Sequence, residues 1–501
     1  MFPIPRADLV QNTADFECNP LVKPTGFREY DARWLYPQEV NLMGLQAIGM
    51  GVAELFRRRE VPARIVVGHD FRGYSSAIKN SLVSGLLAGG MEVHDIGLAL
   101  SPMAYFAQFD LDVEGVAMVT ASHNDNGWTG IKMGLQRPVT FGPDEMSELK
   151  DIVLSGKGQP NDGGGGRYIF VPDYAQRYIE SLTSREPLSR KLKVIAACGN
   201  GTAGFIAPHV LRAVGCEVIE LNTDLDHTFP NHNPNPEDMK MLHAVRDAVL
   251  EHGADVGLAF DGDGDRCGVV DNTGEEIFAD KVGVMLARDI STQHPGAKFV
   301  VDVKSTGLFV TDPVLKANGA ETAYWKTGHS YIKRYNHENG TLVGFEKSGH
   351  FFFSPPLGRG YDDGLVAALA VCDMLDRNPS KTMADLLSEL QTTFQSPTMS
   401  PHCDDEKKYA VVERAVAHFE AKATAGEQLA GQPIRDVNTV NGIRITLEDG
   451  TWGLVRASSN KPELVVVVES PTSLAARNAI FKEIDAYLAT EPDVGAYNQK
   501  I

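Results

Sequence analysis

Three stretches of the chain share one pattern of hydrophobic and polar positions. Each has a basic residue at its second position and then a β-branched run, passes through a small or polar loop into an amphipathic helical stretch, and reaches Gly-x-Glu before a second apolar run. The stretches begin at Ala63, Leu192 and Ala297. A strand, a loop, a helix and a neighbouring strand make a βαβ unit, which builds sheets covered by helices. The pattern predicts three similar α/β domains with mixed sheets, with chance similarity as the alternative.

The last hundred residues carry a different pattern. A linker, TTFQSPTMSPHCDDEKK, precedes a helical stretch, several strand-like runs and a final helical stretch, which together predict a small α+β domain. The Gly-rich segment GKGQPNDGGGGR separates the first repeat from the second, and two helical stretches close the third. We therefore predict four domains around a central cleft, at residues 1–167, 168–278, 279–396 and 397–501.

Composition narrows the partners of such a chain. Its 501 residues exceed what one hydrophobic core holds, and 43% hydrophobic with 23% charged residues is ordinary for a soluble protein. The formal charge of -19 repels phosphate backbones and anionic lipid, so we expect neither nucleic acid nor a membrane as a partner. A small anionic substrate stays possible where basic groups gather locally. The N-terminus lacks the pattern of a secretory signal, and we expect a cytoplasmic protein.

The cysteines add no metal or disulfide framework. They are scattered, without a CxxC pair, and we expect free thiols in a reducing compartment. The six are Cys18, Cys198, Cys216, Cys267, Cys372 and Cys403.

A carboxylate loop lies between two apolar runs in AFDGDGDRCGVV. Asp261, Asp263 and Asp265 alternate, so in an extended loop their side chains converge and repel one another unless a cation lies among them. Hard oxygen ligands favour Mg²⁺ or Ca²⁺. An EF-hand needs Gly and Glu where this chain has Arg266 and Asn272, which excludes that motif. The alternative is a solvated acidic turn.

A serine loop, TASHNDNG, precedes the apolar stretch that holds Lys132. An ordinary Asx or Ser turn would explain Ser122 and His123 by themselves. No GxSxG elbow surrounds the serine, so acyl transfer is not indicated. A phosphoserine could share a phosphate oxygen with Mg²⁺, and Lys132 could supply charge or move a proton. The two loops together predict a phosphoryl-transfer site.

Four motifs in order extend this interpretation into a family resemblance. TASHN with GIK downstream, DGDGDR, GFEKSGH and RASSNKPEL resemble those of the α-D-phosphohexomutases, and most closely their bacterial phosphomannomutase/phosphoglucomutase branch. The resemblance covers nearly the whole chain, from GFREYDAR onward.

The resemblance implies a reaction and its cofactors. Ser122 would carry the phosphate, and Asp261, Asp263 and Asp265 would hold Mg²⁺ together with that phosphate. The enzyme would donate the phosphate to a hexose 1-phosphate, form a hexose 1,6-bisphosphate, and recover the other phosphate. Lys132 would be the general acid/base; Arg266 would neutralise charge and His123 would position the serine.

The same resemblance implies how the sugar is bound. Glu346 and Ser348, in an expected extended loop, would contact the 3- and 4-hydroxyls, with a surface salt bridge as the alternative for Glu346. His329 and His350 match further substrate contacts, although His329 by itself could be a structural histidine. Lys347 lies between Glu346 and Ser348, where the family often has an uncharged residue.

A phosphate clamp is expected near the C-terminus. It would consist of Arg456, Ser458, Ser459 and Asn460. The family often has Asn-Thr where this chain has Ser459 and Asn460, so the hydroxyl and the amide have exchanged places. Other expected substrate contacts are Arg28 and Tyr30, with Arg33 in the same segment, and Lys281 and Lys304, where Lys281 replaces a frequent Arg.

The sequence thus predicts a phosphohexomutase for mannose, glucose or both, acting on small sugar phosphates as a monomer or weak homodimer. Three alternatives remain: a phosphoglucosamine mutase, a non-catalytic sugar-phosphate binding protein, and a serine phosphatase-like hydrolase. Substrate competition distinguishes the first, and isomer formation compared with free phosphate release distinguishes the last.

Overall fold

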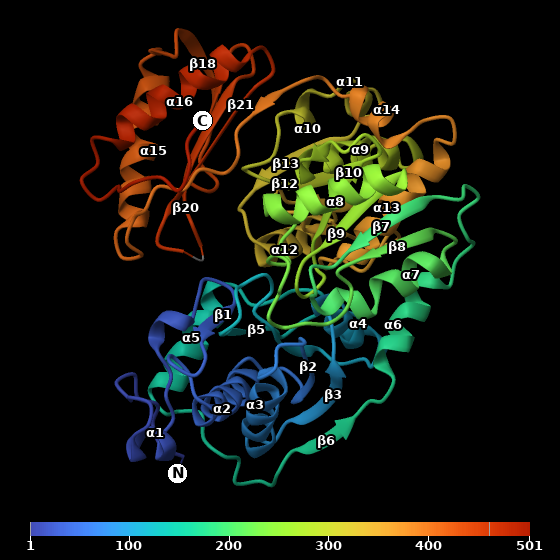
Figure 1. Cartoon of the computed structure of the whole chain (residues 1–501). Helices are drawn as coiled ribbons and strands as arrows, with labels where there is room; N and C mark the ends of the chain where they lie inside the picture. The colour runs from blue at the N-terminus through green and yellow to red at the C-terminus, as the bar shows by residue number, and fades with distance from the viewer. Residues whose placement is uncertain (1, 460) are drawn as a thin grey trace. The chain divides into compact units, whose positions relative to one another are not determined.

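The computed structural model describes residues 2–459 and 461–501, which fall into two compact units (Figure 1). Unit 1 runs to residue 279 and includes residues 333–340 and 348–384. Unit 2 comprises residues 280–332, 341–347 and 385–501. No described helix is long and apolar enough to cross a bilayer. All six cysteines are free thiols.

The first sheet of unit 1 has six strands in the order β1-β5-β4-β2-β3-β6. β2 pairs in parallel with β3 and β4, whereas β5 pairs antiparallel with β4 and β1, so the sheet is mixed, as predicted. β6 follows the Gly-rich segment and pairs with β3, which extends this sheet beyond residue 167. The strands are β1 (Ala32–Leu35), β2 (Arg64–His69), β3 (Glu92–Leu98), β4 (Gly115–Val119), β5 (Trp128–Gly134) and β6 (Arg167–Phe170).

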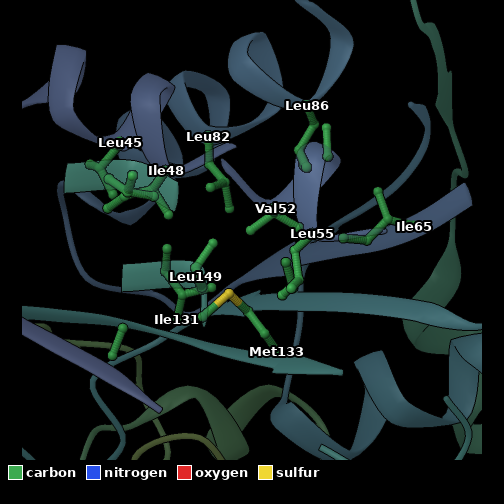
Figure 2. Close-up of a cluster of buried hydrophobic side chains, with 14 of the residues drawn as sticks. Leu45, Ile48, Val52, Leu55, Ile65, Leu82, Leu86, Ile131, Met133 and Leu149 are labelled. Atoms are coloured by element: carbon green, nitrogen blue, oxygen red, sulfur yellow. The ribbon is translucent and has the colours of Figure 1, made fainter. Parts of the chain in front are cut away.

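Helices α2, α3 and α5 bury their apolar faces in one core with this sheet. Figure 2 shows side chains of the three helices interleaved with those of β2 and β5. A Cβ at Gly49 would lie 2.2 Å from the carbonyl oxygen of Leu82, so this glycine permits the close approach of α2 and α3. The helices of this part are α1 (Ala14–Cys18), α2 (Leu42–Arg58), α3 (Ser75–Ala88), α4 (Ser101–Asp110) and α5 (Pro143–Leu154), after the short η1 (Pro24–Gly26).

The second sheet of unit 1 has the order β11-β10-β9-β7-β8. Helix α13, expected to close the third domain, contacts β10 and α7 and thus belongs to unit 1. The strands are β7 (Lys193–Ala197), β8 (Glu217–Leu221), β9 (Val256–Phe260), β10 (Cys267–Asp271) and β11 (Glu276–Ile277). The other elements are α6 (Tyr174–Thr183), η2 (Thr202–Phe205), α7 (Ala207–Ala213), α8 (Met239–His252), β15 (Phe351–Phe353) and α13 (Gly364–Arg377).

Unit 2 begins with the third repeat. β12 pairs in parallel with β13 and β14, as β2 does with β3 and β4, and β7 with β8 and β9. The three predicted βαβ units are therefore confirmed. In each of them a further strand pairs in parallel with the first strand of the unit on its other side. The elements of the third repeat are β12 (Lys298–Asp302), α10 (Leu308–Thr311), α11 (Pro313–Ala317), β13 (Glu321–Trp325) and β14 (Val343–Phe345). Three helices have residues in both units: α9 (Ala279–Gln293), α12 (His329–Asn339) and α14 (Met383–Ser388), of which residues 279, 333–339 and 383–384 belong to unit 1.

The C-terminal part of unit 2 is an antiparallel sheet of order β16-β21-β20-β19-β18-β17, whose sequence predicted its strands and flanking helices. On β21, Val466 and Val468 share a core with α15 and α16, whereas Val465 and Val467 pack with Val303, which follows β12. Both faces are thus buried. The elements are β16 (Phe394–Gln395), α15 (Lys408–Thr424), β17 (Gln428–Leu429), β18 (Gln432–Asn438), β19 (Ile443–Leu447), β20 (Trp452–Ala457), β21 (Leu464–Ser470) and α16 (Leu474–Leu488).

Candidate active site

The serine loop and the carboxylate loop follow equivalent strands of the two sheets in unit 1. Residues 120–127 join β4 to β5, and residues 261–266 join β9 to β10. Each loop leaves the carboxyl end of a strand that pairs in parallel with the first strand of its repeat. Ligand sites of α/β sheets commonly form at such strand ends.

The two loops touch through their backbones. A Cβ on Gly262 would lie only 2.4 Å from the carbonyl oxygen of Ser122, so glycine is required at this contact. The Ser122 hydroxyl donates to Asp261 Oδ2 at 2.9 Å and is buried with it. The serine loop and the carboxylate loop therefore lie in direct contact.

The turn around Ser122 is built by other residues. The Ser122 backbone N–H donates to Thr120 Oγ1 at 2.9 Å, and the serine has a φ of 52°. Arg72 donates to the carbonyl oxygens of Ser122 and Asn124 at 3.0 and 2.6 Å and pairs with Asp70. The serine hydroxyl takes no part in the turn, which leaves it available to carry a group, with His123 Nδ1 at 3.2 Å.

The three aspartates form a buried cluster. Each is 0% exposed, and one oxygen of each lies within 4.8 Å of the others, so the solvated-turn alternative is wrong. Burial and the neighbouring Asp265 carboxylate raise the pKa of Asp261 to about 7. Among the described residues, Asp263 Oδ1 has no hydrogen-bond partner, although Ser101 donates to its other oxygen at 2.6 Å.

Basic side chains surround the cluster. Lys132 Nζ donates to Asp263 at 2.7 Å and also to Asp265, and Arg266 Nε donates to Asp261 at 3.1 Å. Burial alone would lower the pKa of Lys132, but the two carboxylates outweigh it and hold that pKa well above its usual range. Lys132 is therefore an ammonium in this arrangement.

The donor set fits a hard divalent cation. Three carboxylates converge in a buried loop, and one of their oxygens lacks a protein partner among the described residues. Mg²⁺ prefers oxygen ligands and keeps positions for water or phosphate oxygens. Asp261, Asp263 and Asp265 would hold such an ion.

His350 adjoins this cluster from the sugar loop. Its Nε2 lies 3.4 Å from Asp265 Oδ1, and its Nδ1 lies 2.9 Å from the Ser348 hydroxyl. The extended conformation expected for this loop is wrong, because Lys347 and Ser348 form a turn after β14. His350 was expected as a substrate contact, and the structure places it beside Asp265 of the carboxylate loop.

The N-terminal segment also belongs to unit 1. Arg33 donates to the carbonyl oxygen of Thr120 at 2.8 Å and pairs with Asp31 at 2.9 Å, which brings it to the serine loop. Arg28 and Tyr30 lie in the preceding turn, and Tyr30 is buried.

In unit 2, the expected sugar contacts lie at strand and helix ends. Glu346 is buried and accepts from the Gly328 N–H at 2.5 Å, which excludes the surface salt bridge. His329 is buried at the start of α12. Lys304 Nζ lies 3.7 Å from Asp302. Lys281 lies in the first turn of α9, and Lys347 Nζ is 3.6 Å from Asp280.

The expected phosphate clamp follows β20 of unit 2. Arg456 is the residue before the last of this strand and donates to the Ala457 carbonyl oxygen at 2.7 Å, and its buried Nε has no partner among the described residues. Ser458 Oγ accepts from the Lys461 N–H at 3.3 Å, which forms a turn. Ser459 lies in this turn, and Asn460 lies outside the described residues.

Sequence reasoning missed several residues of the site. Arg72 and Asp70 directly follow β2, at the same sheet edge as the serine loop, and their position after the first strand of the repeat was an available signal. Ser101, at the start of α4, carried no local signal, because polar residues at helix starts are common.

Comparisons with known proteins match the chain to one family. Models described as phosphoglucomutase/phosphomannomutase match the chain in order: alpha/beta/alpha domain I at residues 24–159, domain II at 176–274, domain III at 278–394, and the C-terminal domain at 403–486. The two models that hold the serine and carboxylate loops are those of domains I and II.

Individual relatives span almost the whole chain. A phosphomannomutase/phosphoglucomutase of Pseudomonas syringae is 33% identical over 90% of this chain and 93% of its own. A phosphoglucomutase of Neisseria meningitidis is 31% identical over 93% of this chain and 97% of its own. The crystal structure of a phosphoglucomutase/phosphomannomutase family protein from Burkholderia thailandensis has a TM-score of 0.82 at 29% identity, covering 95% of this chain and 99% of that one. The chain therefore belongs to the phosphoglucomutase/phosphomannomutase family, within the α-D-phosphohexomutase superfamily.

Proposed function

We propose that the protein is a Mg²⁺-dependent phosphohexomutase, an isomerase that interconverts the 1- and 6-phosphates of glucose, mannose or both. The observation that carries this proposal is the buried Ser122 hydroxyl, 2.9 Å from Asp261 in a cluster of three buried aspartates. Relatives named phosphoglucomutase and phosphomannomutase over nine-tenths of the chain support it.

The reaction begins with a phosphate on Ser122. The bond between phosphorus and the serine oxygen breaks, a bond to a hydroxyl of the hexose phosphate forms, and the hydroxyl proton passes, with Lys132 as the relay, to the serine oxygen that is released. The product is a hexose 1,6-bisphosphate, which returns its other phosphate to the serine. Mg²⁺, when bound, neutralises charge on the phosphoryl oxygens.

The chain's own residues position and neutralise the reacting groups. Asp261, Asp263 and Asp265 hold the cation, and Arg266 holds Asp261 at 3.1 Å. Lys132, charged and buried, stabilises the phosphoryl oxygens and transfers a proton once bound phosphate draws it from the carboxylates. His123 holds the serine oxygen in place.

Each unit carries substrate contacts that we propose for it separately. In unit 1 these are Arg28, Tyr30, Ser348 and His350. In unit 2 Glu346 accepts from sugar hydroxyls, and the free Nε of Arg456 supports a contact with the phosphate that does not react. The other contacts in unit 2 are Lys281, Lys304, His329, Ser458, Ser459 and Asn460. We expect a cytoplasmic monomer or weak homodimer that binds small sugar phosphates.

The test is an isomerisation assay with a 1,6-bisphosphate primer. We expect conversion of glucose 1-phosphate, mannose 1-phosphate or both that depends on Mg²⁺ and is lost in Ser122→Ala. Ser155→Ala, at an exposed serine of the same domain, is the matched control and should retain activity. A wild-type protein that converts neither sugar would refute the proposal.

The alternatives give different products. Faster turnover of glucosamine 1-phosphate would identify a phosphoglucosamine mutase. Free phosphate without isomer would indicate a hydrolase, and binding without turnover a sugar-phosphate binding protein. A phosphopeptide that contains Ser122 in the wild type and is absent from Ser122→Ala would support the phosphoserine.

A further inference from the structure

A second buried charge cluster lies beside the aspartate loop in unit 1. Lys333 Nζ and Asp362 Oδ1 form an ion pair at 2.7 Å, and both side chains are 0% exposed. Lys333 belongs to α12, and Asp362 lies one residue before Asp363, the N-cap of α13. The pair therefore joins α12 to the segment that leads into α13.

Packing alone does not account for this pair. Removing two charges from water is costly, and apolar side chains of similar volume often serve stability equally well. Burial lowers the pKa of the Lys333 ammonium, although Asp362 opposes that shift. Stability therefore does not explain why this buried ion pair lies beside the aspartate loop, and a role in the site does.

The surroundings of the pair suggest what that role is. One oxygen or nitrogen of Asp265, His350 and Asp362 lies within 4.8 Å of the others, so the His350 ring has carboxylates of two loops beside it. The other ring nitrogen faces the Ser348 hydroxyl at 2.9 Å. The Lys333 ammonium lies 4.0 Å from the ring centroid of Tyr105 on α4, and this cation–π contact holds the ammonium in position.

We propose that Lys333 and Asp362 are positioning residues for the mutase reaction: Asp362 holds the His350 ring against Asp265, and Lys333 holds Asp362. The proposal rests on the proposed function, because His350 is there a substrate contact. A carboxylate beside one ring nitrogen favours a proton on that nitrogen, so that the other nitrogen accepts from Ser348. Ring orientation and the sugar loop are thereby set together.

The same three residues could instead bind a second cation, since carboxylates and imidazole suit a divalent metal. The ammonium of Lys333 speaks against that reading, because it already neutralises the Asp362 carboxylate at 2.7 Å. A measurement of metal affinity separates the two roles.

The test replaces the whole ion pair, so that no charge is left buried alone. In the double variant Lys333→Met with Asp362→Leu we expect kcat to fall by about 10²-fold, with KM and Mg²⁺ affinity within about threefold of wild type. The matched control is Lys79→Met with Asp95→Leu, another buried ion pair of unit 1, which should keep kcat within threefold. Thermal unfolding verifies that each variant folds.

Asp362→Asn provides a second route if the double variant does not fold. It keeps the side-chain shape, and we expect kcat to fall at least tenfold with little change in KM. Wild-type kcat in either folded variant, or an equal loss in the control pair, would overturn the positioning role. A tenfold loss of affinity for Mg²⁺ or Zn²⁺ would also overturn it, since Asp362 would then be a ligand. Inactive wild-type protein would refute the mutase function itself.

Discussion

The contact between the serine loop and the carboxylate loop predicts a severe effect of one added methyl group. In Gly262→Ala the new Cβ would lie 2.4 Å from the Ser122 carbonyl oxygen, whereas ordinary van der Waals contacts begin at 3.4 Å. The obstructing atom is backbone, so no side-chain rotation relieves the clash. The two loops must therefore separate by about 1 Å, the difference between the observed and the ordinary contact.

That displacement acts on the reacting atoms. The hydrogen bond from Ser122 Oγ to Asp261, now 2.9 Å, would lengthen beyond hydrogen-bonding range. A misplacement of about 1 Å can reduce the rate about 10²-fold, and overpacking of this kind destabilises a fold by about 1–3 kcal/mol. We expect kcat to fall about 10²-fold and Mg²⁺ affinity to weaken, while the protein stays folded.

The assay measures kcat with saturating Mg²⁺, Mg²⁺ affinity by calorimetry, and stability by urea unfolding. Gly165→Ala is the matched control, because a Cβ there meets no atom within 4 Å. If Gly262→Ala keeps kcat within threefold of wild type, the two loops do not need this close contact, and the reasoning is wrong.

Three further predictions concern stability. Arg444→Met removes the buried donor to the carbonyl oxygens of Val303 and Ser305, and we expect urea unfolding to show a loss of about 3 kcal/mol; a loss below about 0.5 kcal/mol would contradict this. Burial raises the pKa of Asp363 to about 7, despite the Tyr178 hydroxyl that donates to it, so the folded chain binds this proton more tightly than the unfolded chain. The protonated Asp363 therefore contributes up to about 4 kcal/mol to the free energy of unfolding below about pH 4, and this contribution is lost as the pH rises to 7. In Asp363→Asn the free energy of unfolding should not show this decline between about pH 4 and 7. Mg²⁺ at a hundredfold excess over its dissociation constant should stabilise the protein by about 2.7 kcal/mol in thermal unfolding, and an absence of any shift that EDTA reverses would argue against the cation site.

The repeats were predictable because their information is local. β2, β7 and β12 each begin a βαβ unit whose apolar runs and Gly-x-Glu punctuation are visible within about thirty residues. The membership of α13 in unit 1 was not predictable, because it depends on contacts with β10 and α7, which lie far away in sequence.

The site divides in the same way. The aspartates and the serine could be identified because several unusual residues gather within a short loop. Their contact could only be inferred, since Ser122 and Asp261 are 139 residues apart. Arg72, 50 residues before Ser122, and the pair Lys333 and Asp362 were missed, because charged residues acquire a meaning only through the partners that folding brings.

Unit 1 is built from three separate stretches of the chain, and this has a consequence for protein synthesis. The carboxylate loop is supported by late segments, since the Cys267 N–H donates to Gly349 and the Gly364 N–H donates to Gly264, at 3.0 and 3.1 Å. When residues 1–347 of a nascent chain have emerged from the ribosome, all three aspartates are present, but Gly349 and Gly364, which make these two hydrogen bonds, are not. A message with a premature stop codon at that point would therefore yield a polypeptide that has all three aspartates but lacks the two backbone contacts that support their loop.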